Sequence, residues 1–307
     1  MTECERIINS NILKREFFNE EIMDDFLVTE KRKKIWAVEL DLLLAIDAVC
    51  RKYDLHYYLF WGSLLGAVRH KGFIPWDDDT DIVLTRGDYE KLLKHKDEFE
   101  DPYFFQTPYT DDGYYYSHAK LRNSNTSAID YPFLYQGFNL GIFVDILPLD
   151  LIEESDNGKE RFKRIAELNV LNSTAMRLSN PNLTEKDRNR VEAYPGGNPF
   201  ERYEEIQKLS KYDNGLDSRR VSVFAATVYG FERDVFFRED FADSVYADFL
   251  GYCFPIPIGY DRILRTAYGN YTDLPPIETR GQWHGNVKFF PDIPYKHKVQ
   301  EIIRGGK

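Results

Sequence analysis

Residues 60–84 most constrain what this chain can fold into, because a tight turn there is followed by crowded carboxylates and an apolar strand. The turn is Gly62-Ser63, and the carboxylates are Asp77, Asp78, Asp79 and Asp81. Left bare, these like charges would repel one another. A divalent cation would remove that cost, because hard cations prefer carboxylate oxygens. A small-residue turn beside such carboxylates suits an enzyme that holds a metal-chelated phosphate.

The spacing of the carboxylates indicates which of them act together. Side chains two residues apart in a strand share a face, so Asp79 and Asp81 project together. Asp77 joins them if the strand starts early, whereas Asp78 points away. Asp145 lies far along the chain in an apolar strand, where a carboxylate is costly to bury without a partner or a metal. If the two strands pair, Asp145 becomes a third ligand for one or two metal ions.

The acidic segment has two simpler interpretations. One is a solvated turn with Asp145 in a salt bridge, since Asp populates turns readily. The turn upstream and the isolated strand carboxylate favour the metal site over this interpretation. The other is the start of an EF-hand loop. It fails because Ile82 stands where that loop needs Gly and Asp88 stands where it needs its last Glu.

Basic side chains near the acidic segment are the candidates for substrate binding, with a solvated surface position as the alternative for each. Arg69 and Lys71 lie between the turn and the carboxylates, and Lys120 and Arg122 lie two apart on a candidate strand. Arg forks onto phosphate oxygens and Lys acts as a point charge, so we predict that Lys120 and Arg122 bind phosphate together. His284, in a late loop between glycines, is a further candidate because His suits acid–base work.

Charge and composition narrow the class of partner. Acidic residues outnumber basic ones by 51 to 40, which gives a net charge of −11 and argues against nucleic acid. The charged N-terminus lacks the layout of a signal peptide, and the apolar stretch 221–231 is too short to span a bilayer. We therefore expect a cytoplasmic protein with no integral membrane segment. Three separated cysteines fit neither a zinc site nor a disulfide framework: Cys4, Cys50 and Cys253.

Periodicity predicts the order of the elements. Helices are expected over 30–53, 63–68 and 88–99, with Ser63 and Asp88 as the caps of the latter two. Strands are expected at 55–61, 79–84, 103–106, 114–121 and 141–146. Further along, the composition favours helix over 153–190 and 201–229, a loop over 180–198, and an irregular, aromatic and proline-rich C-terminal part.

Three segments of the chain resemble the LicD family. The first is the long and specific run from Trp61 to Asp81, the second runs from Gly141 to Asp150, and the third spans residues 268–284. Together they spread over residues 30–285, although 153–235 matches nothing. Thr80 departs from the family, where an aliphatic residue is commoner, and this leaves the pair of ligands beside it intact.

The resemblance implies an α+β fold of the nucleotidyltransferase type, a mixed β-sheet core flanked by helices. Residues 1–29 would be an N-terminal extension, 30–285 the catalytic domain with 153–235 as a helical insertion or subdomain, and 286–307 a tail. The implied activity is Mg²⁺-dependent transfer of a phospho-alcohol, phosphocholine in bacterial members, from a CDP-alcohol to a sugar hydroxyl. The acceptor would be a glycan or lipid-linked glycan of lipopolysaccharide, teichoic acid or capsule, which would bring the enzyme to the inner face of the membrane. Mn²⁺ could replace Mg²⁺.

Carried onto this chain, the resemblance makes Gly62 and Ser63 the turn of the fold. It makes Asp79, Asp81 and Asp145 the catalytic, metal-binding carboxylates. Aromatic residues form 15% of the chain and could cage a trimethylammonium head. Three alternatives stay open: transfer of a nucleoside monophosphate from a triphosphate, a sugar-nucleotide glycosyltransferase, and a relative that binds a glycan without turnover.

Overall fold

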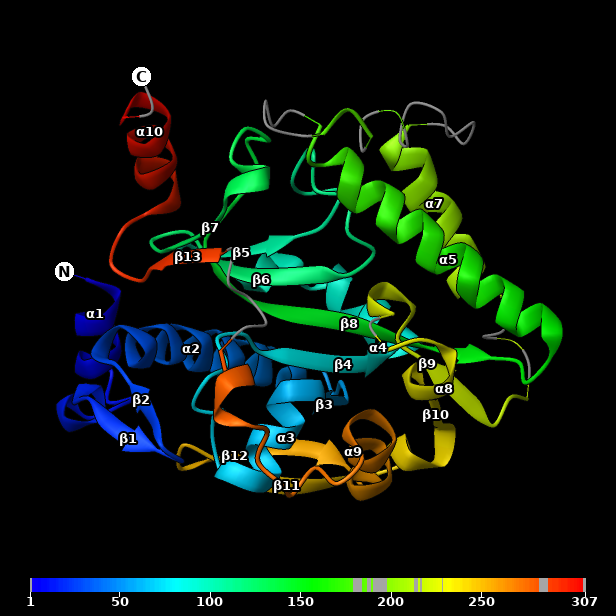
Figure 1. The fold of residues 1–307 in the computed structure, drawn as a ribbon, viewed down its shortest axis with the longest axis horizontal. Helices are drawn as coiled ribbons and strands as arrows, with labels where there is room; N and C mark the ends of the chain where they lie inside the picture. The colour runs from blue at the N-terminus through cyan, green and yellow to red at the C-terminus, as the bar shows by residue number, and fades with distance from the viewer. Residues whose placement is uncertain are drawn as a thin grey trace.

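The structure is a computed structural model that describes residues 2–178, 184–186, 189, 198–212, 215, 217–227, 229–281 and 287–305. Within these residues, a seven-stranded mixed sheet forms the centre of the fold (Figure 1). Its main path is, in order, β10 (Val235–Phe237), β9 (Arg220–Ser222), β8 (Ile142–Ile152), β4 (Asp81–Thr85) and β3 (Tyr57–Leu59). Off this path, β6 (Ala119–Asn123) pairs with β8, and β5 (Tyr103–Gln106) pairs with β6.

The two strands that carry the predicted metal ligands lie side by side. β4 and β8 are parallel, and Asp81 stands directly opposite Asp145 in their register. The other pairings of this sheet are antiparallel, including β6 against β8, which sets Lys120 opposite Asp145. The predicted pairing of the two Asp-bearing strands is therefore confirmed.

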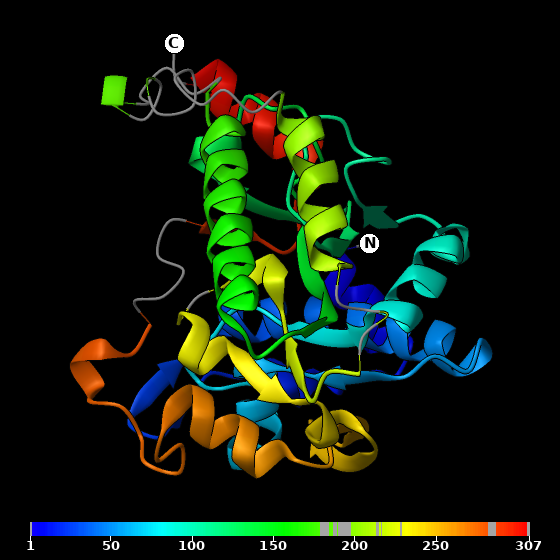
Figure 2. The same ribbon diagram turned by 90° about the vertical axis from the view of Figure 1, so that its right-hand side faces the viewer.

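Helices pack on the sheet and beside it. α2 (Glu30–Lys52) packs against β6 and β8 and begins after Thr29, whose hydroxyl oxygen accepts a hydrogen bond from Arg32 N. α4 (Arg86–Lys94) packs against β4 and β8. α5 (Asp156–Ala175) and α7 (Pro199–Ser210) lie side by side, as Figures 1 and 2 both show.

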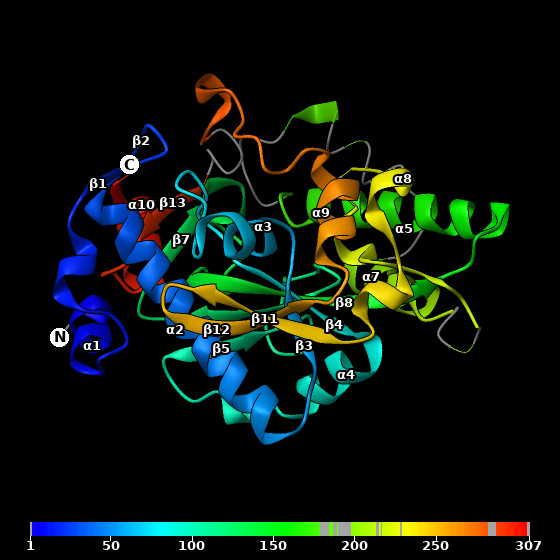
Figure 3. The ribbon, with the colours of Figure 1, turned by 90° about the horizontal axis from the view of Figure 1, so that it is seen from below.

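Smaller elements surround this framework. α3 (Trp61–His70) follows β3, and Figure 3 shows the hairpin of β11 (Ser244–Phe249) and β12 (Tyr252–Pro257) lying beside α3 and β3. The other strand pairs are β1 (Glu21–Met23) with β2 (Phe26–Val28) and β13 (Val287–Phe290) with β7 (Ser127–Asp130). The other α-helices are α1 (Glu3–Asn9), α8 (Phe231–Asp234), α9 (Tyr260–Tyr268) and α10 (Tyr295–Gly305). The 3₁₀ turns are η1 (Arg15–Phe18), η2 (Lys96–Glu98), η3 (Tyr131–Phe133), η4 (Phe224–Ala226), η5 (Arg238–Phe241) and η6 (Ile277–Thr279).

The main core lies between α2, the sheet and the β11–β12 hairpin. Trp36 of α2 stacks on Phe73 with ring centroids 5.1 Å apart, and this packing holds the loop before β4 against the helix. A separate small core between α5, α7 and η4 contains Phe162, Ile206 and Phe224. The segment 153–178 and α7 therefore bury an apolar face of their own.

A buried ion pair joins α4 to β8. Arg86 Nε donates to Asp150 Oδ1 at 2.7 Å, and Arg86 Nη1 donates to Gln207 Oε1 of α7 at 3.0 Å. Both charged side chains are less than a tenth exposed, so each depends on the other in place of water.

The predicted fold class, a mixed sheet flanked by helices, is confirmed, as are the helix at 30–53 to within a residue and the strand at 103–106. Both predicted caps are wrong. α3 begins two residues before Ser63, after Phe60, and α4 begins after Thr85, so Asp88 lies within its first turn. α3 starts just after β3 without a side-chain cap, and α4 starts after Thr85, whose hydroxyl oxygen accepts the backbone N–H of Asp88 at 3.4 Å and so takes the place of Asp88 as the cap.

The C-terminal predictions need correction. Helix over 201–229 is wrong beyond Ser210, because the chain there forms the strand β9, which pairs with β8 and β10, and the turn η4. The part expected to be irregular contains β11, β12, α9, β13 and α10; prolines 255 and 257 are accommodated because β12 is a strand of a two-stranded hairpin. Much of the loop predicted at 180–198 lies outside the described residues, and the domain boundaries stay a prediction. None of the helices in the described ranges is long and apolar enough to cross a membrane.

Candidate active site

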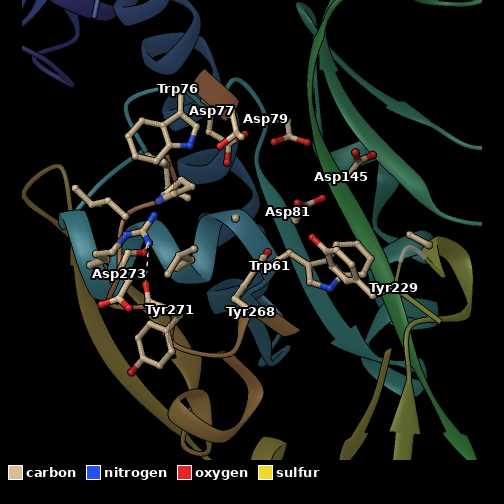
Figure 4. A pocket seen from close by; sticks show the side chains of 18 of the residues that line it. Trp61, Trp76, Asp77, Asp79, Asp81, Asp145, Tyr229, Tyr268, Tyr271 and Asp273 are labelled. Carbon is tan, nitrogen blue, oxygen red and sulfur yellow. Dashed lines mark hydrogen bonds between the residues drawn. The ribbon is translucent and has the colours of Figure 1, made fainter. Parts of the chain in front are cut away.

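A cavity of about 560 Å³ opens at the N-terminus of α3, beside the ends of β4 and β8 (Figure 4). Five carboxylates line it: those of Asp77, Asp79, Asp81 and Asp145, and that of Asp273 at its edge. Figure 4 shows Asp79, Asp81 and Asp145 facing the same space. The structure thus brings the three predicted metal ligands to one cavity, from the loop before β4, from β4 and from β8.

The Gly-Ser turn fits against the carboxylates for two separate reasons. The hydroxyl oxygen of Ser63 accepts the backbone N–H of Asp81 at 2.8 Å. A Cβ atom on Gly62 would lie 2.6 Å from Asp77 Oδ2, so only glycine lets that carboxylate approach the start of α3 this closely. Gly62 lines the cavity, whereas Ser63 is buried and its hydroxyl serves the protein itself.

α2 supports the acidic segment from behind. Arg32 Nη1 and Trp36 Nε1 both donate to the backbone oxygen of Asp77, at 2.6 and 3.1 Å. Arg32 also lies 3.8 Å from Asp78 Oδ2, and Asp78 is not among the cavity-lining residues. The alternation expected from the sequence therefore holds: Asp77, Asp79 and Asp81 reach the cavity and Asp78 does not.

Crowding makes the ionised form of Asp81 costly. Its side chain is buried, and burial, followed by the charges of Asp79 and Asp145, raises its pKa well above the usual range. Glu39 of α2 lies close behind and accepts a hydrogen bond from Thr80 Oγ1 at 3.3 Å. Burial and the nearby aspartates also raise the pKa of Glu39 well above its usual range.

Asp145 has the opposite electrostatic environment. Its Oδ1 atom lies 2.6 Å from Lys120 Nζ and 3.0 Å from His118 Nε2. Burial alone would raise the pKa of Asp145, but these two neighbours outweigh burial and hold it far below its usual range. Lys120 also lies 3.5 Å from the centroid of the Phe143 ring, which fixes its ammonium over Asp145. Asp145 is therefore a carboxylate, and neither contact involves its Oδ2 atom.

These carboxylates fit a hard divalent cation. Among the residues that the structure describes, no three His, Cys, Asp or Glu side chains are already gathered around one metal position. The donor set nevertheless suits Mg²⁺, because it is all oxygen and because the mutual repulsion that raises the pKa of Asp81 is what a cation would relieve. Metal binding by Asp79, Asp81 and Asp145 stays a proposal.

Aromatic side chains form much of the remaining wall. Trp61, Trp76, Tyr229 and Tyr268 line the cavity, and the rings of Tyr229 and Tyr268 meet edge to face with centroids 6.1 Å apart. Trp61 opens α3 with φ 39°, a strained value for a residue with a side chain. Its indole N–H is buried and has no hydrogen-bond partner among the described residues. Strain and an unused donor at the same residue are typical of a binding site.

The predicted basic residues occupy different surroundings. Arg69 lines the cavity but donates to two backbone carbonyls, and Lys71 is exposed at the left-handed C-cap of α3. Lys120 and Arg122 are buried in β6 beside Phe143 and are not among the cavity-lining residues. Arg122 bonds Gln106 and the carbonyl of Gly141, so its guanidinium is engaged within the protein. Their binding of substrate stays a prediction.

His284 lies outside the described residues. His118 was missed, although a usable signal existed: it is two residues before Lys120, so both face Asp145 by the alternation of a strand. Tyr229 and Tyr268 could not have been chosen from an aromatic-rich sequence, because folding alone brings them to the cavity.

Comparison with known proteins places this site in a family. Residues 54–164 match the family described as LicD/FKTN/FKRP, nucleotidyltransferase domain. This chain carries a LicD-family nucleotidyltransferase domain. The matched range contains β3, α3, β4 and β8, and therefore Asp77, Asp79, Asp81 and Asp145. The fifth cavity carboxylate, Asp273, lies outside it.

The LicD-family domain also has full-length and local relatives. The chain is 26% identical over 268 residues to the lipopolysaccharide cholinephosphotransferase LicD of Haemophilus influenzae, covering 80% of this chain and 92% of that protein. Uncharacterized proteins of Rickettsia prowazekii and Rickettsia typhi are 45% identical over 49 residues and 51% identical over 37 residues. The predicted family is confirmed, and with it the prediction of an enzyme of the transferase class.

Proposed function

We propose that this enzyme transfers phosphocholine from CDP-choline to a sugar hydroxyl of a cell-surface glycan such as lipopolysaccharide. The observation that carries the proposal is the pairing of Asp81 with Asp145 at the floor of an aromatic-walled cavity. The similarity to a lipopolysaccharide cholinephosphotransferase supports the cargo and the acceptor. We further propose that the reaction takes place in the cytoplasm, at the inner membrane face when the acceptor is lipid-linked.

The cavity suits a substrate with a cationic end. Trp61, Trp76, Tyr229 and Tyr268 present ring surfaces, and faces of aromatic rings attract quaternary ammonium groups. Asp77 adds negative charge on the same side of the cavity as Trp76 (Figure 4). A trimethylammonium group would be favoured here over a neutral polyol such as ribitol or glycerol.

The carboxylates would hold the phosphate end of the donor. Mg²⁺ bound by Asp79, Asp81 and Asp145 would neutralise the charge of the diphosphate and of the transition state. The sugar oxygen forms a bond to the phosphorus that carries choline, and the bond from that phosphorus to the oxygen of CMP breaks with its electrons. Asp145 or a nearby acidic group takes the hydroxyl proton, and the second is favoured because, against the effect of burial, Lys120 and His118 hold the pKa of Asp145 far below its usual range. Lys120, held on Asp145, supplies positive charge close to this position.

The test is incubation of the purified chain with Mg²⁺ and CDP-choline, CDP-ribitol or CDP-glycerol, together with a lipopolysaccharide or teichoic acid acceptor. We expect CMP release to be fastest with CDP-choline and to stop on addition of EDTA. Asp79→Asn and Asp145→Asn should each abolish turnover, whereas Asp97→Asn, at an exposed position of η2, should not. Release of pyrophosphate from CTP without use of CDP-choline would instead establish nucleotidyl transfer.

A further inference from the structure

The segment from Asn270 to Gly281, here named the strap, forms one wall of the cavity without being part of the sheet. Tyr271, Asp273 and Thr279 are among the cavity-lining residues. Gly269 has φ 69° and Gly281 has φ 79°, so both ends of the strap adopt backbone conformations that side chains disfavour. Such positions are natural points for a segment to turn about.

Little apolar burial holds the strap in place. Tyr271 is its buried side chain, whereas Leu274 and Ile277 are 41% and 51% exposed. The strap's backbone N–H bonds are local turns, such as Asp273 N to Asn270 O at 3.1 Å. Tyr271 Oη also donates to Asp261 Oδ1 of α9 at 2.8 Å. A segment with mostly exposed side chains and local backbone N–H bonds has low intrinsic stability.

Two arginines also hold the strap at its ends. Arg69 Nη1 donates to Tyr271 O at 2.7 Å and to Asp273 O at 3.2 Å. Figure 4 shows Tyr271 and Asp273 at the same edge of the cavity. At the other end, Arg280 stacks 4.6 Å from the Trp76 ring and donates to Asp24 O.

Arg69 connects this wall to the catalytic elements. It lies on α3, the helix whose first turn contains Gly62, so its position is fixed by the same element that contacts Asp77. Its bonds to main-chain carbonyls are charge-assisted and therefore stronger than neutral ones. They fix the backbone of the strap whatever side chains the strap carries.

We propose that Arg69 is a positioning residue that holds the strap as a wall of the cavity, rather than a ligand of the substrate phosphates. The strap then opens and closes the cavity by breaking and remaking the two Arg69 bonds. This inference goes beyond the proposed function and stands on geometry that does not depend on which phospho-alcohol is transferred.

The test measures amide hydrogen exchange in the free protein, in EDTA and without substrate. For Arg69→Ala we expect exchange in peptides covering residues 270–281 to accelerate about tenfold or more, the size of losing a charge-assisted hydrogen bond. Arg69→Lys, which keeps one donor group but not the fork, should give an intermediate increase. The matched control Arg51→Ala, at an exposed arginine of α2, should leave the strap unchanged.

Two results would overturn the proposal. One is unchanged strap exchange in both Arg69 variants. The other is a selective loss of CDP binding, measured calorimetrically, while strap exchange stays at the wild-type rate, because that is the behaviour of a phosphate ligand. Since exchange needs no substrate, failure of the proposed transferase reaction would leave this test intact. If Arg69→Ala does not fold, Arg69→Lys alone decides, because it retains the charge and the length of the side chain.

Discussion

The hydroxyl oxygen of Ser63 accepts the backbone N–H of Asp81 and so fastens the first turn of α3 to the first residue of β4. Because both groups are buried, the bond is not replaced by water when it is lost. It holds the cavity end of β4 in place through a main-chain atom and leaves the Asp81 carboxylate for ligands.

Ser63→Ala should therefore destabilise the protein and weaken the site together. An unsatisfied buried N–H costs about 1–3 kcal/mol, so we expect a loss of that size in the free energy of unfolding. Urea denaturation measures it, with the exposed Ser10→Ala as the control. An unchanged denaturation midpoint would show that the hydroxyl does not fasten β4.

Gly62→Ala should separate activity from stability. The new methyl group would displace the Asp77 carboxylate, which is the flexible end of a side chain, so folding should change by less than about 1 kcal/mol. Turnover should fall because the carboxylate group is moved. The control is Gly87→Ala in α4, where a Cβ atom meets nothing within 4 Å. Equal turnover in the two variants would contradict the argument.

Asp81→Asn should stabilise the metal-free protein while it abolishes turnover. The pKa of Asp81 is raised by burial and by its carboxylate neighbours, so the neutral amide removes an unfavourable charge, and we expect a higher free energy of unfolding at pH 7. Adding Mg²⁺ should raise the melting temperature of the wild type but not that of the variant. Thermal unfolding with Mg²⁺ and with EDTA measures both effects. A metal-free variant less stable than the metal-free wild type would contradict the claim that the neighbouring carboxylates destabilise ionised Asp81.

Tyr268→Leu should act on the choline end of the donor. Loss of a cation–π contact is worth about 0.5–2 kcal/mol, which corresponds to a KM for CDP-choline raised by about 2-fold to 30-fold. The KM for CDP-glycerol, which has no cation, should change little. The exposed Tyr246→Leu is the control. Parallel losses with both donors would mean that the ring shapes the cavity without recognising charge.

Stability should depend on pH through Asp234. Burial raises the pKa of this carboxyl to about 6, although Tyr229 N and Gly230 N both donate to its Oδ2 atom. The folded protein thus binds this proton more tightly than the unfolded chain does. Below about pH 4 the group is protonated in both the folded and the unfolded state. As the pH rises from about 4 to 6, the free energy of unfolding should fall, by about 1–3 kcal/mol in total. Asp234→Asn should flatten this part of the profile of unfolding free energy against pH.

Much of the site's framework could be predicted from local pattern. The two-residue period of strands predicted that Asp81 and Asp145 would meet, and the register of β4 and β8 sets them opposite each other. The strand expected from residue 79 begins at Asp81, so Asp77 and Asp79 reach the cavity from the loop before it. The helix at 30–53 follows from its apolar spacing.

The roles of the basic residues could not be predicted in the same way. Whether Arg69 faces a phosphate or two backbone carbonyls depends on where residues 271 and 273 fold, some two hundred positions later. Arg122 is engaged by Gln106 and Gly141, contacts that exist only once β5, β6 and β8 have paired. The C-terminal hairpin was not predicted, because prolines indicate the end of a strand when its pairing is not known.

The buried ion pair between Arg86 and Asp150 has a consequence for the distant carboxylates. Arg86 comes five residues after Asp81, and Asp150 comes five residues after Asp145, so both pairs follow one alignment of β4 with β8. A slip of one residue between the strands would turn every β8 side chain to the opposite face of the sheet. It would separate the charges of Arg86 and Asp150 in surroundings where water cannot solvate them. The ion pair at one end of the two strands therefore disfavours any misaligned pairing of β4 with β8. It thereby helps to place Asp145 opposite Asp81 at the other end.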